Sequence, residues 1–267
     1  MKIVVITGSS KGIGLGLATE FLKKEFSVVL SGRNEKNLQN AVSALTASYG
    51  GDTVAGHPCD VTNVKQVEAL WEAAIKLYGR VDIWINNAGI TNPTKLLWEV
   101  DPSDINNVIN TNISGVIYGT QVALKGMIEQ GAGQIYNMEG FGSGDMMRVG
   151  MTLYGTTKRA TRYFTESLVE EARDLPVQIC TLGPGMVVTD FMLDDLKQLP
   201  EDKREETKIV YNMLADKVET VTPFLVEEIL KNGKTGAKID WLTMEKANAR
   251  FEDEFYLNRD LLSEFGM

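Results

Sequence analysis

Short apolar runs alternate with helix-like segments along the whole chain. Taken together, the runs are close to continuously apolar, which is typical of strands that are covered on both faces in a parallel sheet. Between the first two runs, Ile13, Leu17, Phe21 and Leu22 recur at the spacing of one helix face. The seven runs are residues 2–8, 26–32, 52–60, 81–89, 133–140, 177–185 and 237–243.

Strand–helix–strand units that follow one another in this way predict one architecture. Because the crossover between parallel strands is almost always right-handed, repeated units wind helices onto both faces of one sheet. We therefore expect an α/β protein with a doubly wound, Rossmann-type fold, a seven-stranded parallel sheet and a single domain spanning residues 1–267. Such sheets bind ligands at the carboxyl ends of their strands, so the site is expected at that edge.

A glycine-rich loop joins the first predicted strand to the first predicted helix. In ITGSSKGIGLGLA, the glycines allow a tight turn and a close approach of the backbone to a pyrophosphate, and the next helix offers unpaired N–H groups. The alternative is a purely structural turn, but the strand before the loop and the helix after it favour a dinucleotide site. Cofactor contacts from this loop are expected at Gly8, Ser10, Lys11, Gly12, Ile13 and Gly14.

The end of the second predicted strand indicates which dinucleotide is bound. An NAD site usually has a carboxylate here for the ribose 2′-hydroxyl, whereas this chain has Ser31, Gly32 and Arg33. Arg33 can bind a 2′-phosphate through two hydrogen bonds, and Lys11 adds a second positive charge. The sequence therefore predicts NADP(H) as the cofactor, with ordinary surface roles for both cations as the alternative.

Composition argues against several other classes of protein. The chain has 36 acidic and 27 basic residues, a formal net charge of −9 and no long basic run, so nucleic acid is not an expected partner. Cys59 and Cys180 lie in separate predicted strands and His57 is the only histidine, so neither a disulfide nor a metal site is expected. The opening apolar run is too short for a signal sequence or a membrane span. We expect a cytoplasmic protein without a membrane partner.

Five motifs occur in the order and spacing of one enzyme family. TGSSKGIG, CDVT, NNAG, YGTTK and GPGMVVTD together resemble the short-chain dehydrogenase/reductase family. The resemblance implies that the aspartate of CDVT meets the adenine, that residues 86–89 brace the cofactor, and that residues 184–189 contact its nicotinamide half. The cofactor residues implied on these motifs are Asp60, Val61, Asn87, Ala88, Gly89, Tyr154, Lys158, Pro184, Gly185, Val187 and Thr189.

Tyr154 and Lys158 carry the expected chemistry. Four residues apart in a predicted helix, they share one face and can approach the same cofactor ribose. A cationic Lys158 favours tyrosinate, so we expect the pKa of Tyr154 to lie below its usual range. Tyr154 then exchanges a proton with the carbonyl or alcohol, while the cofactor transfers the hydride. Asn112 matches, by resemblance, the asparagine that links the lysine to solvent through a water; its alternative role is to stabilise a break in a helix.

The serine that the family places before this tyrosine is missing. In the family pattern Asn-x-Ser-Ser the second serine binds the substrate carbonyl, and here Glu139 and Gly140 stand at the two serine positions. We expect Ser143, in the glycine-rich loop GFGSG, to supply this hydrogen bond. The alternatives are a backbone N–H freed by Gly140 and a loss of reductase activity. An ionised Glu139 would repel a developing alkoxide, so we expect it to orient a substrate donor or the loop.

The altered motif also indicates a branch of the family. YNMEGFGSG, together with ETVTPFLVEEIL and TGAKIDWLT, resembles the chlorophyll b reductases, which reduce a formyl group on a chlorin ring with NADPH. Because the chain opens without a leader or a membrane segment, we expect another bulky apolar aldehyde or ketone as the substrate. A hydroxysteroid or acyl-type ketone is the alternative substrate. A sensor or scaffold that binds NADPH without chemistry is the alternative function.

Three segments outside these motifs also carry expectations. Residues 186–215, where the family has its most variable helices, are expected to form a substrate lid. Residues 243–267 are expected to form a C-terminal helical extension. The helical stretches after residue 101 and over residues 152–174 match the helices through which the family dimerises, which implies a homodimer or a homotetramer.

Overall fold

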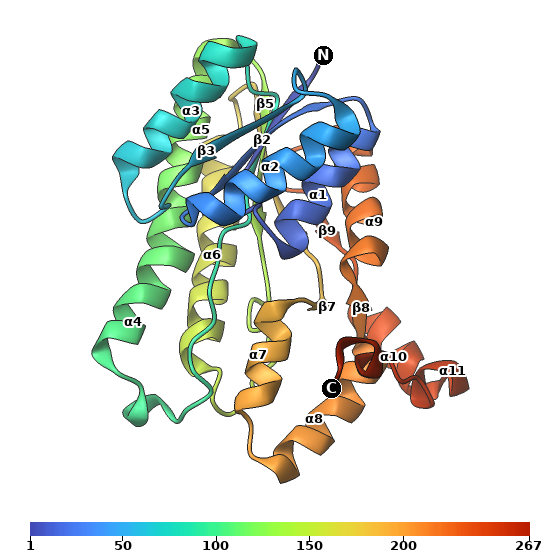
Figure 1. Cartoon of the computed structure of the whole chain (residues 1–267). Helices are drawn as coiled ribbons and strands as arrows, with labels where there is room; N and C mark the ends of the chain where they lie inside the picture. The colour runs from blue at the N-terminus through green and yellow to red at the C-terminus, as the bar shows by residue number, and fades with distance from the viewer.

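Seven parallel strands form the main sheet of the computed structural model, which describes residues 1–267 (Figure 1). Their order is β3-β2-β1-β4-β5-β6-β9, so the chain winds outward first in one direction from β1 and then in the other. Each strand falls inside one of the predicted apolar runs, which confirms the doubly wound sheet. The strands are β1 (Ile3–Ile6), β2 (Ser27–Gly32), β3 (Val54–Pro58), β4 (Ile83–Asn86), β5 (Gly133–Met138), β6 (Val177–Gly183) and β9 (Lys238–Asp240).

Helices cover both faces of this sheet and extend beyond its carboxyl edge (Figure 1). None of them combines the length and the apolar character that a membrane-spanning helix requires. A π-helical turn, Asn110–Ser114, joins α4 to α5. The helices are α1 (Gly12–Lys23), α2 (Glu35–Tyr49), α3 (Val64–Tyr78), α4 (Pro102–Ile109), α5 (Gly115–Gln130), α6 (Thr152–Glu171), α7 (Asp190–Gln198), α8 (Glu201–Leu214), α9 (Val218–Lys231), α10 (Met244–Glu252) and α11 (Glu254–Leu257).

Helix α3 illustrates how local sequence sets these elements. At its start the side chain of Asn63 accepts a hydrogen bond from a backbone N–H of the first turn. At its end Gly79 adopts a left-handed conformation with φ of 77°, which stops the helix. Val67, Leu70 and Ala74 form its buried stripe at helical spacing. The stripe fixes which side of the helix faces the sheet.

The core lies on the two faces of the sheet. On one face, 25 buried residues join the sheet to α1, α2 and α9, with Leu17 and Phe21 fully buried. On the other face, 13 buried residues join the sheet to α3 and α5, around Trp84 and Met127. Each such side chain contributes about 1.5–3 kcal/mol by leaving water. The sheet is therefore a rigid platform whose carboxyl edge holds the loops.

Two further strands, β7 (Met186–Val188) and β8 (Ala215–Lys217), form a small parallel sheet of their own. The apolar pattern does not predict it, because each strand has only three residues and β8 reads Ala-Asp-Lys. Helices α7 and α8 lie between the two strands in sequence. A third apolar cluster packs these helices onto the C-terminal residues Leu261 and Leu262. Residues 243–267 contain α10, α11 and a 3₁₀ turn at Leu262–Phe265, and they support the helices after β7.

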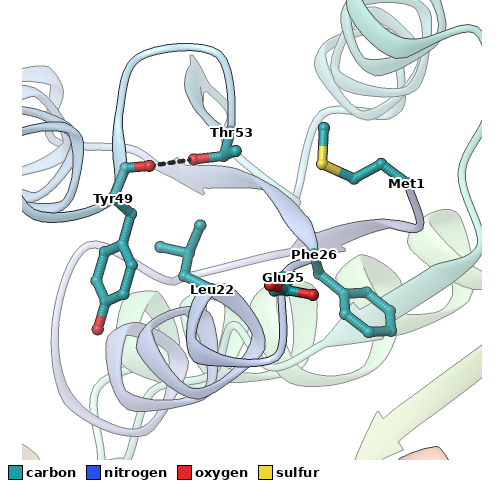
Figure 2. A pocket seen from close by; sticks show the side chains of 6 residues that line it. All are labelled: Met1, Leu22, Glu25, Phe26, Tyr49 and Thr53. Carbon is teal, nitrogen blue, oxygen red and sulfur yellow. Dashed lines mark hydrogen bonds between the residues drawn. The ribbon is translucent and has the colours of Figure 1, made fainter.

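An open hollow of about 500 Å³ lies on the opposite side of the sheet from the expected site. Figure 2 shows its lining by Met1, Leu22, Glu25, Phe26, Tyr49 and Thr53. Met1, Phe26 and Thr53 come just before the amino ends of β1, β2 and β3, so the hollow lies at the amino edge of the sheet. Ligands of doubly wound sheets bind at the carboxyl ends, so this hollow is not the site that the motifs predict.

Candidate active site

The glycine loop after β1 packs directly against the segment after β4. Gly8 has φ of 62°, and a Cβ atom there would lie 2.7 Å from Ala88 Cα. A Cβ atom at Gly14 would lie 2.6 Å from the Asn87 amide nitrogen, which donates hydrogen bonds to the carbonyls of Thr7 and Gly8 at 2.9 and 3.0 Å. The structure thus brings together predicted cofactor residues from two strands, in a turn that only glycine allows.

The end of β2 lies beside the same loop. A Cβ atom at Gly32 would lie 3.2 Å from Ser10 Oγ, and the next residue, Arg33, is exposed. The Lys11 ammonium, in contrast, lies 2.9 Å from a carboxylate oxygen of Asp190 in α7. Both of these side chains are largely exposed, so the ion pair is weak and a phosphate can compete for Lys11. Of the two cations predicted to bind the 2′-phosphate, Arg33 is therefore better placed than Lys11.

Asp60 and Val61 lie in the loop that follows β3. One oxygen of the Asp60 carboxylate accepts hydrogen bonds from the backbone N–H and the hydroxyl of Thr62, at 3.0 and 2.8 Å. Val61 is buried against Gly115, where a Cβ atom would lie 2.7 Å from a Val61 methyl carbon. This loop is held next to β2, because the Cys59 N–H donates to the Gly32 carbonyl at 3.2 Å. The predicted adenine contact thus lies near the predicted 2′-phosphate contact.

The segment after β6 closes the other side of the glycine loop. Pro184 is buried, and Gly185 has φ of 70° with a Cβ position only 2.4 Å from Leu242 Cβ. Strand β7, which contains Val187, is held by its pairing with β8. Beyond it, Thr189 Cγ2 lies 3.4 Å from the Cβ position of Gly12. The predicted nicotinamide contacts therefore lie against the predicted pyrophosphate contacts.

Tyr154 and Lys158 share one buried face of α6, as their spacing predicts. Lys158 Nζ donates a hydrogen bond to the Met138 carbonyl at 3.0 Å and lies 5.7 Å from the centre of the Tyr154 ring. Burial raises the pKa of Tyr154 above its usual range, and burial lowers the pKa of Lys158 to about 8. The predicted lowering of the Tyr154 pKa is wrong for this arrangement, because desolvation of the phenolate outweighs a lysine at this distance.

Asn112 lies in the π-helical turn between α4 and α5. Its side chain accepts a hydrogen bond from the Ile90 N–H and donates to the Ile90 carbonyl, both at 2.9 Å. A Cβ atom at Gly89 would lie 3.4 Å from Asn112 Oδ1 and 3.7 Å from Lys158 Nζ. The asparagine therefore meets Lys158 across Gly89 and also lies at a break in the helical pattern. The two roles considered for Asn112 are compatible.

Gly140 leaves room for the phenol of Tyr154. A Cβ atom at this position would lie 2.6 Å from Tyr154 Oη and 3.3 Å from Lys158 Cε. A serine cannot occupy the position without displacing the phenol. Two residues on, Gly142 has φ of 88°, and its Cβ position lies 2.4 Å from Gly155 Cα. The glycines thus let the loop after β5 pass directly over the start of α6.

Ser143 is held in this loop by its backbone. Its N–H donates to the Gly140 carbonyl at 3.1 Å, and its own carbonyl accepts from Arg159 at 3.1 Å and from Arg162 at 3.4 Å. The residue is 9% exposed, and its hydroxyl makes no hydrogen bond within the chain. The backbone contacts place Ser143 beside the face of α6 that follows Tyr154, with a hydroxyl free for another partner.

A polar cluster links α7 and α8 to the loops that carry Thr94 and Arg148. The Asp195 carboxylate accepts hydrogen bonds from Tyr211 at 3.0 Å, from Arg148 at 3.4 Å and from the Thr94 hydroxyl. Arg148 also donates to the Tyr211 hydroxyl at 2.9 Å. Sequence reasoning missed this cluster. Its one signal is the acidic Asp195 within the otherwise apolar stripe of α7.

Two more residues missed at the sequence level contact Tyr154. Asn92 accepts a hydrogen bond from the Tyr154 N–H at 2.9 Å and donates to the Gly150 carbonyl at 2.9 Å, so it fixes the start of α6. Phe191, in α7, packs on the Tyr154 ring with 5.8 Å between ring centres. The segment after β7 therefore forms an apolar cover over the tyrosine. No set of His, Cys, Asp or Glu side chains with the arrangement of a metal site is present.

Known proteins share this arrangement of motifs. A family model described as short chain dehydrogenase matches residues 2–199. The chain is 33% identical over 256 residues to the probable chlorophyll(ide) b reductase NYC1 of Arabidopsis thaliana, which covers 90% of this chain and 50% of that protein. It is 36% identical over 231 residues to the chlorophyll(ide) b reductase NOL of the same plant, covering 85% and 64%. The chain thus spans about half to two thirds of the length of these relatives.

A solved structure extends the similarity to three dimensions. ElxO with NADP bound matches with a TM-score of 0.76 and 29% identity, over 90% of this chain and 96% of that chain. The match therefore includes both the sheet and much of the segment beyond residue 199.

Proposed function

Because this chain belongs to the short-chain dehydrogenase family, we propose that it is an NADP(H)-dependent oxidoreductase that reduces the carbonyl of a bulky apolar aldehyde or ketone. The observation that carries the proposal is the meeting of Lys158 and Asn112 across Gly89, beside the glycine loop, with the Tyr154 ring centre 5.7 Å from Lys158 Nζ. The NADP bound to ElxO and the similarity to chlorophyll(ide) b reductases support the cofactor and the substrate class. A hydroxysteroid or an acyl-type ketone is the alternative substrate.

The residues around the glycine loop fit a dinucleotide. Gly8 and Gly14 form a cradle that a Cβ atom would fill, with the amino end of α1 behind it. Arg33 would bind the 2′-phosphate and Asp60 the adenine, while Val187 and Thr189 would meet the nicotinamide half. When bound, the cofactor supplies the hydride.

Two side chains of α6, Tyr154 and Lys158, carry out the proton transfer. Tyr154 donates its phenolic proton to the carbonyl oxygen as the alkoxide develops, because a neutral acid at this point removes that negative charge. Lys158, held by the Met138 carbonyl, binds the ribose and stabilises the tyrosinate that remains. Asn112 orients the water through which Lys158 and Tyr154 regain a proton. We assign the carbonyl hydrogen bond to Ser143, the free hydroxyl in the loop over α6.

The substrate lies, in this proposal, under a lid formed by residues 186–215. Phe191 covers Tyr154, and the Asp195 cluster closes the lid onto the loops that carry Thr94 and Arg148. These contacts exclude water from the phenol, which strengthens its interaction with the developing charge. An apolar cover of this kind favours a substrate with little charge near its carbonyl.

A substrate panel tests the function. Purified protein should oxidise NADPH in the presence of bulky aromatic or polycyclic aldehydes, with chlorophyllide b, hydroxysteroid-derived ketones and acyl ketones as parallel members. Gly140 in place of the family serine favours a second candidate, a sensor that binds NADPH without chemistry. Tight NADPH binding by calorimetry without turnover on any member of the panel would replace the first candidate by the second.

Replacing Arg33 by alanine is expected to weaken NADPH binding about 10- to 100-fold and to leave NADH binding nearly unchanged. The lost interactions are hydrogen bonds to a charged phosphate, each of about 1.5–3 kcal/mol. Fluorescence titration with both nucleotides measures the ratio. Lys11→Ala is the control, and its effect should be smaller because Lys11 is paired with Asp190. Equal losses for NADPH and NADH would show that Arg33 does not read the 2′-phosphate.

Replacing Ser143 by alanine is expected to lower kcat for carbonyl reduction about 10²- to 10³-fold, the effect of removing one donor that stabilises an oxyanion. NADPH affinity should not change, since Ser143 lies in the substrate loop. Ser103→Ala, at the exposed start of α4, is the control. Unchanged turnover would transfer the role to a backbone N–H near Gly140 and would leave the reductase proposal intact.

We also propose that the protein forms a homodimer or a homotetramer. Apolar side chains remain exposed on α4, α5 and α6: Ile109 is 37%, Ile128 is 40% and Tyr163 is 73% exposed. α4, α5 and α6 are the helices that the family resemblance implies for dimerisation. Sedimentation velocity measures the state directly, and a monomer at micromolar concentration would contradict the proposal.

A further inference from the structure

Glu139 is a buried carboxylate whose two chain neighbours both contact Lys158. It follows β5 directly, is 5% exposed, and its N–H donates to the Leu182 carbonyl at 2.8 Å. One carboxylate oxygen lies 3.5 Å from Lys238 Nζ on the edge strand β9, which is separated from β5 by β6. The other oxygen is buried without a hydrogen-bond partner. A half-satisfied buried carboxylate is costly, so its retention calls for a physical explanation.

The two neighbours of Glu139 both contact Lys158. The carbonyl of Met138 accepts the hydrogen bond from Lys158 Nζ at 3.0 Å, and the Cβ position of Gly140 lies 3.3 Å from Lys158 Cε. The end of the Lys158 side chain is therefore held between residues 138 and 140. Burial lowers the pKa of Lys158 to about 8, and the negative charge of Glu139 acts against that lowering. Glu139 is the one charged group that opposes the desolvation of this lysine.

Four charged groups face the Glu139 carboxylate. Lys158 and Arg162 approach it from α6, and Lys238 and Asp240 from β9. Burial raises the pKa of Asp240, and the charge of Glu139 adds to that rise while Lys238 opposes it. The set is unequal in exposure, because Lys158 is 4% exposed whereas the Lys238 side chain is 37% exposed. Solvent screens Lys238, so the interaction with Lys158 is the less screened of the two.

We propose that Glu139 is a positioning residue that keeps Lys158 charged and fixed beside Tyr154, so that the lysine acts as a cation during carbonyl reduction. The inference rests on the proposed function of Tyr154 and Lys158 and gives the acidic residue of the NMEG motif its role. It revises the expectation from the sequence, since the Glu139 carboxylate pairs with Lys238 on β9 while residues 138 and 140 hold Lys158. A cation beside Tyr154 stabilises the tyrosinate that proton donation leaves behind.

A purely structural role is the competing explanation, because the ion pair with Lys238 also ties β5 to the sheet edge. The two roles predict opposite behaviour for two variants. Glu139→Gln removes the charge that stabilises cationic Lys158, so the pKa of Lys158 should fall. Lys238→Gln breaks the same ion pair but removes a cation that competes for Glu139, so the pKa of Lys158 should stay or rise. A purely structural role would change the pKa of Lys158 in the same direction in both variants.

The direct test needs no substrate. In protein with ¹³C-labelled lysine side chains, the Cε resonance of Lys158, assigned through Lys158→Met, is titrated by NMR in wild type and both variants. We expect Glu139→Gln to lower the midpoint by about one unit, Lys238→Gln to leave it or raise it, and Glu139→Asp to restore part of the shift. An unchanged midpoint in Glu139→Gln, or the same fall in both variants, overturns the proposal.

The pH dependence of reduction supplies a second readout. Cationic Lys158 is required, so activity should fall as pH rises through its pKa, and Glu139→Gln should move this alkaline limb to lower pH. Above both midpoints the variant should be about tenfold slower than wild type, and near pH 6 the two should be similar. A loss that is equal at every pH overturns the proposal. If wild type turns over no carbonyl at all, the proposed function fails while the NMR result stands by itself.

Discussion

Replacing Tyr154 by phenylalanine is expected to lower kcat for carbonyl reduction about 10²- to 10⁴-fold, because the phenol is the proposed general acid. The ring remains, so its packing on Phe191 and the fold of α6 should be kept. NADPH affinity should change little, since the hydroxyl does not hold the cofactor phosphates. Stopped-flow turnover with the best carbonyl of the panel, together with NADPH titration, separates the two effects.

The matched control for this variant lies on the same helix. Tyr163 is 73% exposed, and Tyr163→Phe removes the same hydroxyl away from the site, so it should retain wild-type kcat. A Tyr154→Phe enzyme that keeps more than about a tenth of its turnover would contradict proton donation by this residue. A variant that loses turnover and NADPH affinity together would indicate a disturbed fold instead, which circular dichroism would show.

Much of the fold was predictable because burial on both faces of a sheet leaves a strong pattern. The runs that became β1, β2, β4 and β6 are largely apolar, those of β3 and β9 less so, and helices between them show stripes at helical spacing. The small β7–β8 sheet left no such pattern. Its strands pair because the chain returns past itself after α8, and three residues with a central aspartate carry no periodicity.

The contacts of the candidate site also differ in how far the sequence predicts them. Contacts between strand ends follow from topology, so the meeting of Gly8 with Ala88 and of Tyr154 with Lys158 could be predicted. Contacts made by α7 and α8 depend on packing between segments far apart in sequence, as with Thr94 and Asp195. The prediction that the pKa of Tyr154 is lowered was wrong for a related reason. Spacing shows a nearby lysine, but only the folded chain shows how far the phenol is withdrawn from water.

The ion pair made by the exposed Lys11 could not be predicted from the sequence. Its place in the glycine loop predicts a phosphate contact, yet α7 brings Asp190 to within 2.9 Å of its ammonium. Asp190 lies 179 residues further along the chain, so no local pattern predicts its contact with Lys11. The ion pair joins α7 to the glycine loop after β1, and a bound phosphate would compete with Asp190 for the same charge.

Replacing Asp216 by alanine is expected to destabilise the protein by about 3–5 kcal/mol, the cost of leaving a buried cation without its partner. Asp216 lies in β8 and is 4% exposed. One oxygen accepts from Arg250 and from the Trp241 indole, both at 2.7 Å, and the other accepts from Arg259 at 3.3 Å. Arg250 is 2% exposed; its Nη1 donates to the Leu214 carbonyl at 3.0 Å and its Nε has no hydrogen-bond partner, so Asp216 supplies the negative charge that balances it.

Urea unfolding measures the loss of stability, and hydrogen exchange locates it. Exchange should increase first in α10, α11 and β8, because Asp216 joins the C-terminal extension to the strand that pairs with β7. NADPH affinity should fall as well, since β7 carries the segment proposed to meet the nicotinamide. Glu166→Gln, which breaks the exposed pair with Arg162, is the control and should cost less than about 0.5 kcal/mol.

The double variant Asp216→Ala/Arg250→Met separates the charge effect from simple loss of packing. If the cost of Asp216→Ala comes from the uncompensated guanidinium, removing that cation should recover a large part of the stability, because an apolar replacement of a buried pair is often neutral. If the two losses add instead, Asp216 acts mainly through Trp241 and Arg259. A single-variant cost no larger than that of Glu166→Gln would show that the C-terminal extension is held by its apolar contacts around Leu261 and Leu262 alone.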